Sequence, residues 1–152
     1  MRKIICLCLI FAFCLPLVGC REEQNAYDIL SEFVSDYGGS GVIYSPSVSE
    51  GSPGYISEGL VERAFLFTDG LGDNFALLLN SHIDKPSECG VFVCSDDEEV
   101  RLAEEICLER VRLLSGEGGF VKKRGRVVYY YVLSDPDRAE RIFREIIKIK
   151  DI

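Results

Sequence analysis

Hydrophobic residues recur at helical spacing in three stretches of the chain. Residues 25–37 place apolar side chains on one face, and two glycines follow, as glycines do at the C-terminal end of many helices. Residues 96–115 begin with four carboxylates, which suit the positive end of a helix dipole, and then carry an apolar face. The same spacing recurs from Asp135 to Ile147. We therefore predict three helices.

A fourth helical pattern follows Ser52. Ser52 before Pro53 has the form of an N-cap with proline in the first turn, and apolar residues continue at helical spacing from Ile56 to Phe65. Gly54 and Gly59 lower the helix propensity of this stretch. We expect a helix that begins at Ser52.

Three segments have the composition of β-strands. Residues 75–79 and 89–94 are short apolar runs, and residues 126–133 are rich in valine and tyrosine on both faces, which predicts a position inside a sheet. Residues 41–44 could add a short strand. This order of elements predicts an α+β fold: a small two-layer sandwich with a mainly antiparallel or mixed sheet and helices packed on one face.

The first twenty residues differ from the rest of the chain. Met1, Arg2 and Lys3 form a basic start, and residues 4–18 carry no charge. At about 1.5 Å per residue this run is too short to cross a hydrocarbon layer of roughly 30 Å, so it has the properties of a signal sequence. Its end, LVGC at residues 17–20, resembles the lipobox of bacterial lipoproteins, whose cysteine receives lipid before the preceding peptide is removed.

The lipobox resemblance implies three parts: a signal peptide at residues 1–19, a lipidated tether at residues 20–24, and a single α+β domain at residues 25–152. It implies lipid on Cys20 and a protein held on the extracytoplasmic face of the cell membrane. An ordinary secretory signal peptide and an uncleaved membrane anchor are the alternatives.

The charge of the chain is strongly acidic and uneven. After residue 20 there are 15 Lys and Arg against 25 Asp and Glu, a formal charge of −10. Such a surface repels nucleic acid, so we exclude nucleic-acid binding. Residues 21–100 hold 3 basic and 16 acidic groups, whereas residues 101–152 hold 12 and 9. We expect the basic part to pack beside the acidic part; a basic face turned toward the membrane or an anionic wall polymer is the alternative.

Three cysteines, Cys89, Cys94 and Cys107, follow Cys20. In a strand, Cys89 and Cys94 would lie on opposite faces about 16 Å apart, whereas the Cα atoms of a disulfide lie within about 7 Å. Cys94 and Cys107 could meet if the following helix folds back over the strand. We expect three small buried hydrophobic side chains. One disulfide, or redox or metal chemistry, is the alternative.

Residues 38–55 combine five glycines, five serines, two prolines and two tyrosines. Such a stretch resists regular structure, and loops of this length often carry function. Tyrosine gives rigid contact area, and serine gives adaptable hydrogen bonds. The candidate residues for binding a ligand or partner are Tyr44, Ser45, Glu50 and Tyr55. A plain connecting loop is the alternative.

The chain has no motif of a catalytic or metal centre. No GxSxG, P-loop or HExxH pattern occurs, and His82 has no metal-ligand spacing to any cysteine. The acidic segment DGLGD at residues 69–73 lacks the ligand spacing of an EF-hand. We therefore predict neither a cofactor nor a metal site, and we favour a protein that is not an enzyme.

Four segments of the second half stand out together: FALLLNS, ECGVFVCSD, CLERVRLL and VVYYYVLSD. On these, residues 74–149 resemble an uncharacterised family of small lipoproteins of clostridia-like bacteria, a domain of unknown function. The resemblance implies an α+β fold and supplies no catalytic residue.

These observations predict a membrane-anchored lipoprotein that acts as a non-enzymatic binding module at the cell envelope. Its partner would be an envelope protein or a wall polymer. The alternative is a thiol-dependent redox or enzymatic role that uses Cys89, Cys94 or Cys107.

Overall fold

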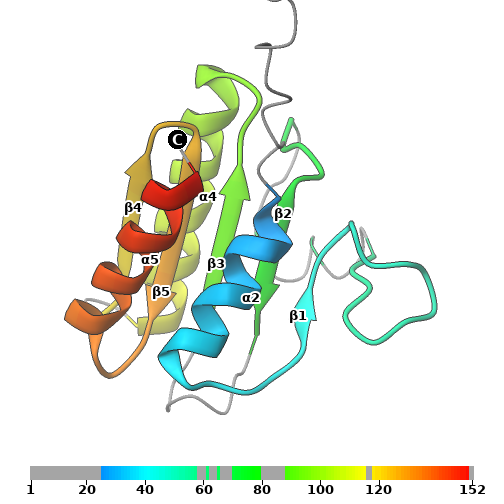
Figure 1. Ribbon diagram of the computed structural model, residues 1–152. Coiled ribbons are helices and arrows are strands. Elements are labelled where there is room, and N and C mark those ends of the chain that lie inside the picture. The colour runs from blue at the N-terminus through cyan, green and yellow to red at the C-terminus, as the bar shows by residue number, and fades with distance from the viewer. Residues whose placement is uncertain are drawn as a thin grey trace, which may run out of the picture.

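The computed structural model describes residues 25–57, 61, 65, 70–79, 88–115 and 118–150. Figure 1 shows a single sheet with helices on both of its faces. The expected signal peptide, the tether with Cys20, and His82 lie outside the described residues. The elements in chain order are α2 (Ala26–Tyr37), β1 (Ile43–Tyr44), β2 (Phe75–Leu78), β3 (Glu88–Val93), α4 (Asp97–Ser115), β4 (Phe120–Arg124), β5 (Val127–Val132) and α5 (Pro136–Lys150).

The five strands form one antiparallel sheet in the order β1-β2-β3-β5-β4. β3 lies in the middle, where Phe92 is opposite Phe75 of β2 and Val91 is opposite Tyr129 of β5. All six residues of β5 are buried, which confirms its predicted position inside the sheet. The α+β class and the antiparallel sheet are therefore as predicted.

Helices cover both faces of the sheet, which corrects the predicted arrangement of two layers with helices on one face. Tyr129 and Tyr131 belong to a core cluster with α2 and α5. Tyr130, between them, belongs to a second cluster with α4 and with Phe65. Because side chains alternate along a strand, the fully apolar β5 needs cover on each side. The molecule has three layers, with α2 and α5 on one face and α4 on the other (Figure 1).

Polar side chains define where α2 begins, and a glycine defines where it ends. The Asn25 side chain accepts a hydrogen bond from the Tyr27 amide at 2.8 Å, as an N-cap does. Asn74, directly before β2, accepts from the Ala26 amide at 2.9 Å. Gly38 ends the helix with a φ of 79°, a left-handed conformation that glycine adopts without steric cost.

The starts of α4 and α5 use aspartate caps. Asp96 accepts from the Glu99 amide at 2.9 Å, and Asp135 accepts from the Arg138 amide at 3.0 Å. The predicted carboxylate start of α4 is thus confirmed, and α5 begins directly after Asp135, as its spacing predicted. Each helix buries the face that its spacing predicted, with Ala103 and Cys107 buried in α4 and Phe143 buried in α5.

Two sequence-based expectations need correction. Ser52 and Pro53 lie in turns and do not begin a helix. The helical hydrogen bonds begin later, where the Val61 amide donates to the Ser57 carbonyl oxygen and the Phe65 amide donates to the Val61 carbonyl oxygen. Residues 58–60 and 62–64 lie outside the described residues.

The hydrophobic pattern also fails to predict β4. This edge strand has the sequence FVKKR and is largely exposed, so it has no apolar run. It forms a hairpin with β5, and Gly125 in the connecting turn has a φ of 56°. Lysine on an exposed edge is a common protection against strand pairing with other chains.

None of the described helices combines the length and apolar character needed to span a membrane.

Candidate functional site

The loop from Ser45 to Tyr55 is closed at its base by backbone contacts. Ser45 and Tyr55 form a parallel bridge, and the Ser45 amide donates to the Gly54 carbonyl oxygen at 3.0 Å. The Ser45 hydroxyl, in a residue only 1% exposed, donates to the Phe75 carbonyl oxygen at 2.8 Å. The loop is therefore tied to the first residue of β2. We call residues 45–55 the closed loop.

Tight turns shape the interior of the closed loop. The amides of Val48, Ser52 and Tyr55 each donate to the carbonyl oxygen three residues earlier. Gly54 has a φ of 90°, and a Cβ there would collide with the Ile43 carbonyl oxygen. The loop therefore has a defined backbone conformation. At position 54 that conformation requires glycine, because any side chain would clash with the backbone of Ile43.

The structure separates the four predicted binding residues by their exposure. Glu50 and Tyr55 are exposed, with Tyr55 at 36% of its surface. Tyr44 is half-buried and packs against the second core cluster. Ser45 is buried, and its hydroxyl is engaged by Phe75 and Ser47 inside the protein. Ser45 therefore holds the loop in place, and of the four predicted residues Glu50 and Tyr55 lie at the surface.

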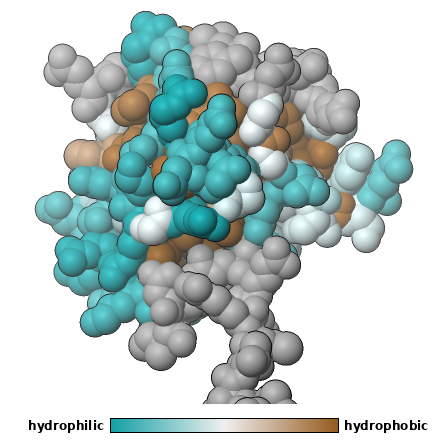
Figure 2. All heavy atoms as spheres, turned by 90° about the horizontal axis from the view of Figure 1, so that it is seen from above, coloured by the Kyte–Doolittle hydropathy of each residue, from teal (hydrophilic) through white to brown (hydrophobic). Residues whose placement is uncertain are grey.

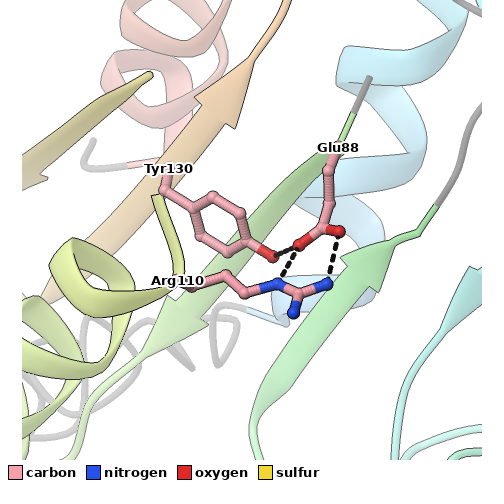
Figure 3. A network of polar contacts seen from close by, with 3 residues as sticks. All are labelled: Glu88, Arg110 and Tyr130. Atoms are coloured by element: carbon pink, nitrogen blue, oxygen red, sulfur yellow. Dashed lines mark hydrogen bonds and ion pairs between the residues drawn. The ribbon is translucent and has the colours of Figure 1, made fainter. Parts of the chain in front are cut away.

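A buried polar network joins α4 to the sheet (Figure 3). The Arg110 guanidinium of α4 donates to both oxygens of the Glu88 carboxylate, at 2.8 and 2.7 Å. The Tyr130 hydroxyl donates to the same carboxylate at 2.6 Å. Glu88 is 3% exposed and Tyr130 is fully buried. Bidentate pairs of this kind are among the stronger polar contacts in proteins.

The electrostatics of the network fit a fixed structural role. Burial, reinforced by the neighbouring Glu88 carboxylate, raises the pKa of Tyr130 well above its ordinary value. The hydrogen bond with Glu88 raises the pKa of Arg110. The tyrosine therefore stays neutral and the arginine stays charged. The sequence gives no signal for this network, since Glu88 and Arg110 are 22 residues apart and meet only through tertiary packing.

The three described cysteines are free and buried, as expected for small hydrophobic side chains. Cys89 belongs to the first core cluster and Cys94 to the second, which confirms that they lie on opposite faces. Burial raises the pKa of all three thiols, and for Cys94 the neighbouring carboxylates help to raise it to about 12. Thiolate is the nucleophilic form of cysteine, so these thiols are poorly suited to attack a substrate.

The described residues also line surface hollows outside the closed loop. One, of about 290 Å³, borders the start of α4, where the Glu99 carboxylate accepts hydrogen bonds from the amides of Gly72 and Ser95. Another, of about 500 Å³, lies along α5 and is lined by both arginines and carboxylates. Within the part of the chain that the structure describes, no group of three or more His, Cys, Asp or Glu side chains could hold a metal ion.

Comparison with known proteins gives no match to a family model, to a curated protein or to a solved structure. The resemblance of residues 74–149 to a lipoprotein family therefore stays a prediction. Any function must be argued from the residues and contacts of this chain.

Proposed function

We propose that this protein is a lipid-anchored, non-enzymatic binding module on the extracytoplasmic face of the cell membrane. Lipid on Cys20 would attach it, and the closed loop would contact an envelope protein or a wall polymer. The anchor follows from the basic start, the uncharged run and the LVGC sequence at residues 17–20. The surface proposed to contact the partner is inferred from the geometry of the closed loop.

The observation that carries the binding proposal is the contrast between the base and the outside of the closed loop. At the base, Ser45 is buried and bonded to Gly54 and Phe75. On the outside, Glu50 and Tyr55 are exposed. Binding residues are commonly found on loops that a rigid scaffold positions. An exposed tyrosine on a fixed backbone loses little conformational freedom on binding, which favours affinity.

The exposed side chains also indicate the chemistry of a partner. Val42, 44% exposed, precedes β1, and Gly54 lies beside its side chain, so Val42 and Tyr55 offer apolar and aromatic surface at the foot of the loop. Glu50 adds one negative charge. A partner would therefore present an apolar contact together with a hydrogen-bond donor or a cation.

The thiol-dependent alternative receives less support from the structure. A redox or nucleophilic cysteine is usually accessible and has a lowered pKa. The buried Cys89, Cys94 and Cys107 have raised pKa values. We therefore retain the binding role as the proposal.

Affinity capture with matched variants tests this function. Full-length lipidated protein, a Tyr55→Ala variant and a Phe120→Ala variant are purified with their partners from the native membrane. Phe120 is a suitable control because it is an aromatic residue of similar exposure, 40%, at the opposite edge of the sheet. A partner retained by the wild type and by Phe120→Ala, but lost from Tyr55→Ala, supports the proposal. An identical set of partners for all three proteins contradicts it.

A further inference from the structure

A row of cations lies along α5 and the adjacent strand β4. Arg141, Arg144 and Lys148 line the hollow of about 500 Å³, together with Arg124. Arg141, Arg144 and Lys148 are exposed. The Arg124 guanidinium donates to the Arg144 carbonyl oxygen at 3.4 Å, which links the strand to the helix. We call these four residues the basic hollow.

Arg141, Arg144 and Lys148 form no direct ion pair with the carboxylates that the structure describes. Among the described carboxylates, none lies within 4.0 Å of the charged nitrogens of Arg141, Arg144 or Lys148. These three side chains of α5 are therefore available to an anion from outside the protein.

Carboxylates also line the hollow, and one of them, Glu140, already accepts hydrogen bonds within the protein. The Glu140 oxygens accept hydrogen bonds from the hydroxyls of Tyr129 and Tyr131 at 3.2 to 3.4 Å. Asp137 and Glu145 complete the lining. Asp137 belongs to the first turn of α5, far along the helix from Lys148. Glu145 lies between Arg144 and Lys148, so the four cations of the lining exceed its three carboxylates by one charge.

The C-terminal end of α5 lies beside the start of α2. The two helices run antiparallel, since Arg138 packs on the Tyr37 ring at 5.0 Å and Phe143 stacks on Phe33 with 3.8 Å between ring centroids. Figure 1 shows the C-terminal end of α5 and the start of α2 at the same end of the molecule.

The start of α2 is also the part of the domain that is closest in sequence to the proposed anchor. Cys20 precedes Asn25 by five residues, which span at most about 18 Å. Figure 2 shows the molecule from this end, where hydrophilic side chains cover most of the described surface. Such a surface suits contact with lipid headgroups rather than insertion among acyl chains.

We propose that the basic hollow binds phosphate groups of anionic phospholipids in the same membrane and so fixes the orientation of the domain. This inference rests on the proposed function for the attachment through Cys20. Guanidinium groups match the geometry of phosphate oxygens, and cations close to an anionic membrane each add to the attraction. The basic hollow would thus give the domain a second contact with the membrane, in addition to the lipid on Cys20.

The acidic net charge does not oppose such a contact at close range. The formal charge of −10 after residue 20 arises mainly from residues 21–100. At physiological salt, exposed charges are screened over about 8 Å, so the local cations determine the interaction at the membrane surface. β4 and β1 lie at opposite edges of the sheet, so docking through the basic hollow leaves the closed loop accessible.

Lysine acetylation tests the inference on the full lipidated protein. The protein is placed in vesicles of phosphatidylcholine alone or of phosphatidylcholine with phosphatidylglycerol, and mass spectrometry follows the reaction rates of Lys148 and Lys123. Lys123 serves as the internal reference because it pairs with Glu104 of α4, on the other face of the sheet. We expect acetylation of Lys148 to slow several-fold relative to Lys123 only in the anionic vesicles, and high salt to reverse this. An unchanged ratio of the two rates overturns the inference.

A matched pair of variants distinguishes the effect of the basic hollow from the effect of the protein's net charge. Arg144→Gln should weaken the contact by about fivefold, the effect of one cation near an anionic membrane surface. Arg101→Gln makes the same charge change on α4, where the side chain is 71% exposed, and should leave the protection of Lys148 unchanged. Equal losses in the two variants would show that net charge, and not the hollow, governs the interaction.

Two further measurements are needed. One distinguishes lipid phosphate from soluble phosphate, and the other covers the case in which Cys20 carries no lipid. Inorganic phosphate added to the phosphatidylcholine vesicles should not protect Lys148; equal protection would indicate a site for soluble phosphate and overturn the membrane assignment. If the purified chain carries no lipid on Cys20, the proposed attachment is contradicted. Flotation of that chain with anionic vesicles then decides the inference: binding that Arg144→Gln weakens supports it, and lack of binding overturns it.

Discussion

The ring of Tyr130 lies across Gly90, its partner on β3, in the space that a side chain at position 90 would occupy. This close approach allows the Tyr130 hydroxyl to reach Glu88, further along β3, at 2.6 Å. A glycine, which usually weakens a strand, here makes room for a buried polar network.

Gly90→Ala should therefore destabilise the fold. The new Cβ would collide with the Tyr130 ring and would lie 2.8 Å from the Leu77 side chain. Overpacking of a tight core typically costs about 1–3 kcal/mol. Urea denaturation measures this loss. Tyr130→Ala in the Gly90→Ala background should show favourable coupling in a double-mutant cycle, whereas strictly additive losses would contradict the proposed contact.

Two arginines on α4 should differ sharply in their contribution to stability. Arg110→Gln leaves the buried Glu88 carboxylate without its ion-pair partner and should cost about 3–5 kcal/mol. Arg112→Gln removes an exposed pair with Glu109 and should change the free energy of unfolding by about 1 kcal/mol or less. Chemical denaturation of both variants provides the comparison. Similar costs for the two would show that the buried network does not stabilise the fold.

Ser45→Ala should loosen the closed loop. The substitution leaves the Phe75 carbonyl oxygen without the hydroxyl that donates to it, at a cost of about 1–3 kcal/mol if no water replaces it. Hydrogen exchange of residues 46–55 should become faster. Ser49→Ala, at an exposed position of the same loop, is the matched control and should leave the exchange rates unchanged. Equal exchange in both variants would mean that Ser45 does not tie the loop to β2.

The buried thiols should be unreactive in the native protein. Burial raises the pKa values of Cys89, Cys94 and Cys107, so little thiolate forms near neutral pH. A thiol reagent such as dithionitrobenzoate should label these cysteines only after denaturant is added. Rapid labelling of any of them in the folded state would revive the thiol-dependent alternative.

Alkaline pH should destabilise the protein through the same buried groups. The pKa values of Tyr129, Tyr130 and Tyr131 are raised mainly by burial, as are those of the three thiols. The unfolded state therefore loses these protons at lower pH than the folded state does. Their contribution to stability is complete below the unfolded pKa values, about 8.5 for cysteine and 10 for tyrosine, and declines as the pH rises above them. Denaturation midpoints measured between neutral and strongly alkaline pH should fall steadily; a constant midpoint would contradict this.

The amphipathic helices and the apolar strands were predictable because their signals are local. The spacing of apolar residues and the glycine after Tyr37 are sufficient to place α2, and the carboxylates after Ser95 place the start of α4. β4 was not predictable from hydrophobicity, since an exposed edge strand with two lysines and an arginine buries little apolar surface. Three layers could have been inferred from β5, because a strand that is apolar on both faces requires cover on both.

The site was less predictable because its contacts are long-range. The composition of residues 38–55 identifies a loop, and it does not reveal that Ser45 bonds to Phe75, 30 residues away. The sequence therefore could not separate the buried Ser45 from the exposed Glu50 and Tyr55. The Glu88 and Arg110 pair escaped prediction for the same reason.

The most direct measurement of the central claim is the intact mass of the mature protein extracted from its native membrane. The account predicts a chain that begins at Cys20 and carries a diacylglycerol on the thiol of that residue. A chain with a free thiol at position 20, or one recovered without lipid from the culture medium, would contradict it.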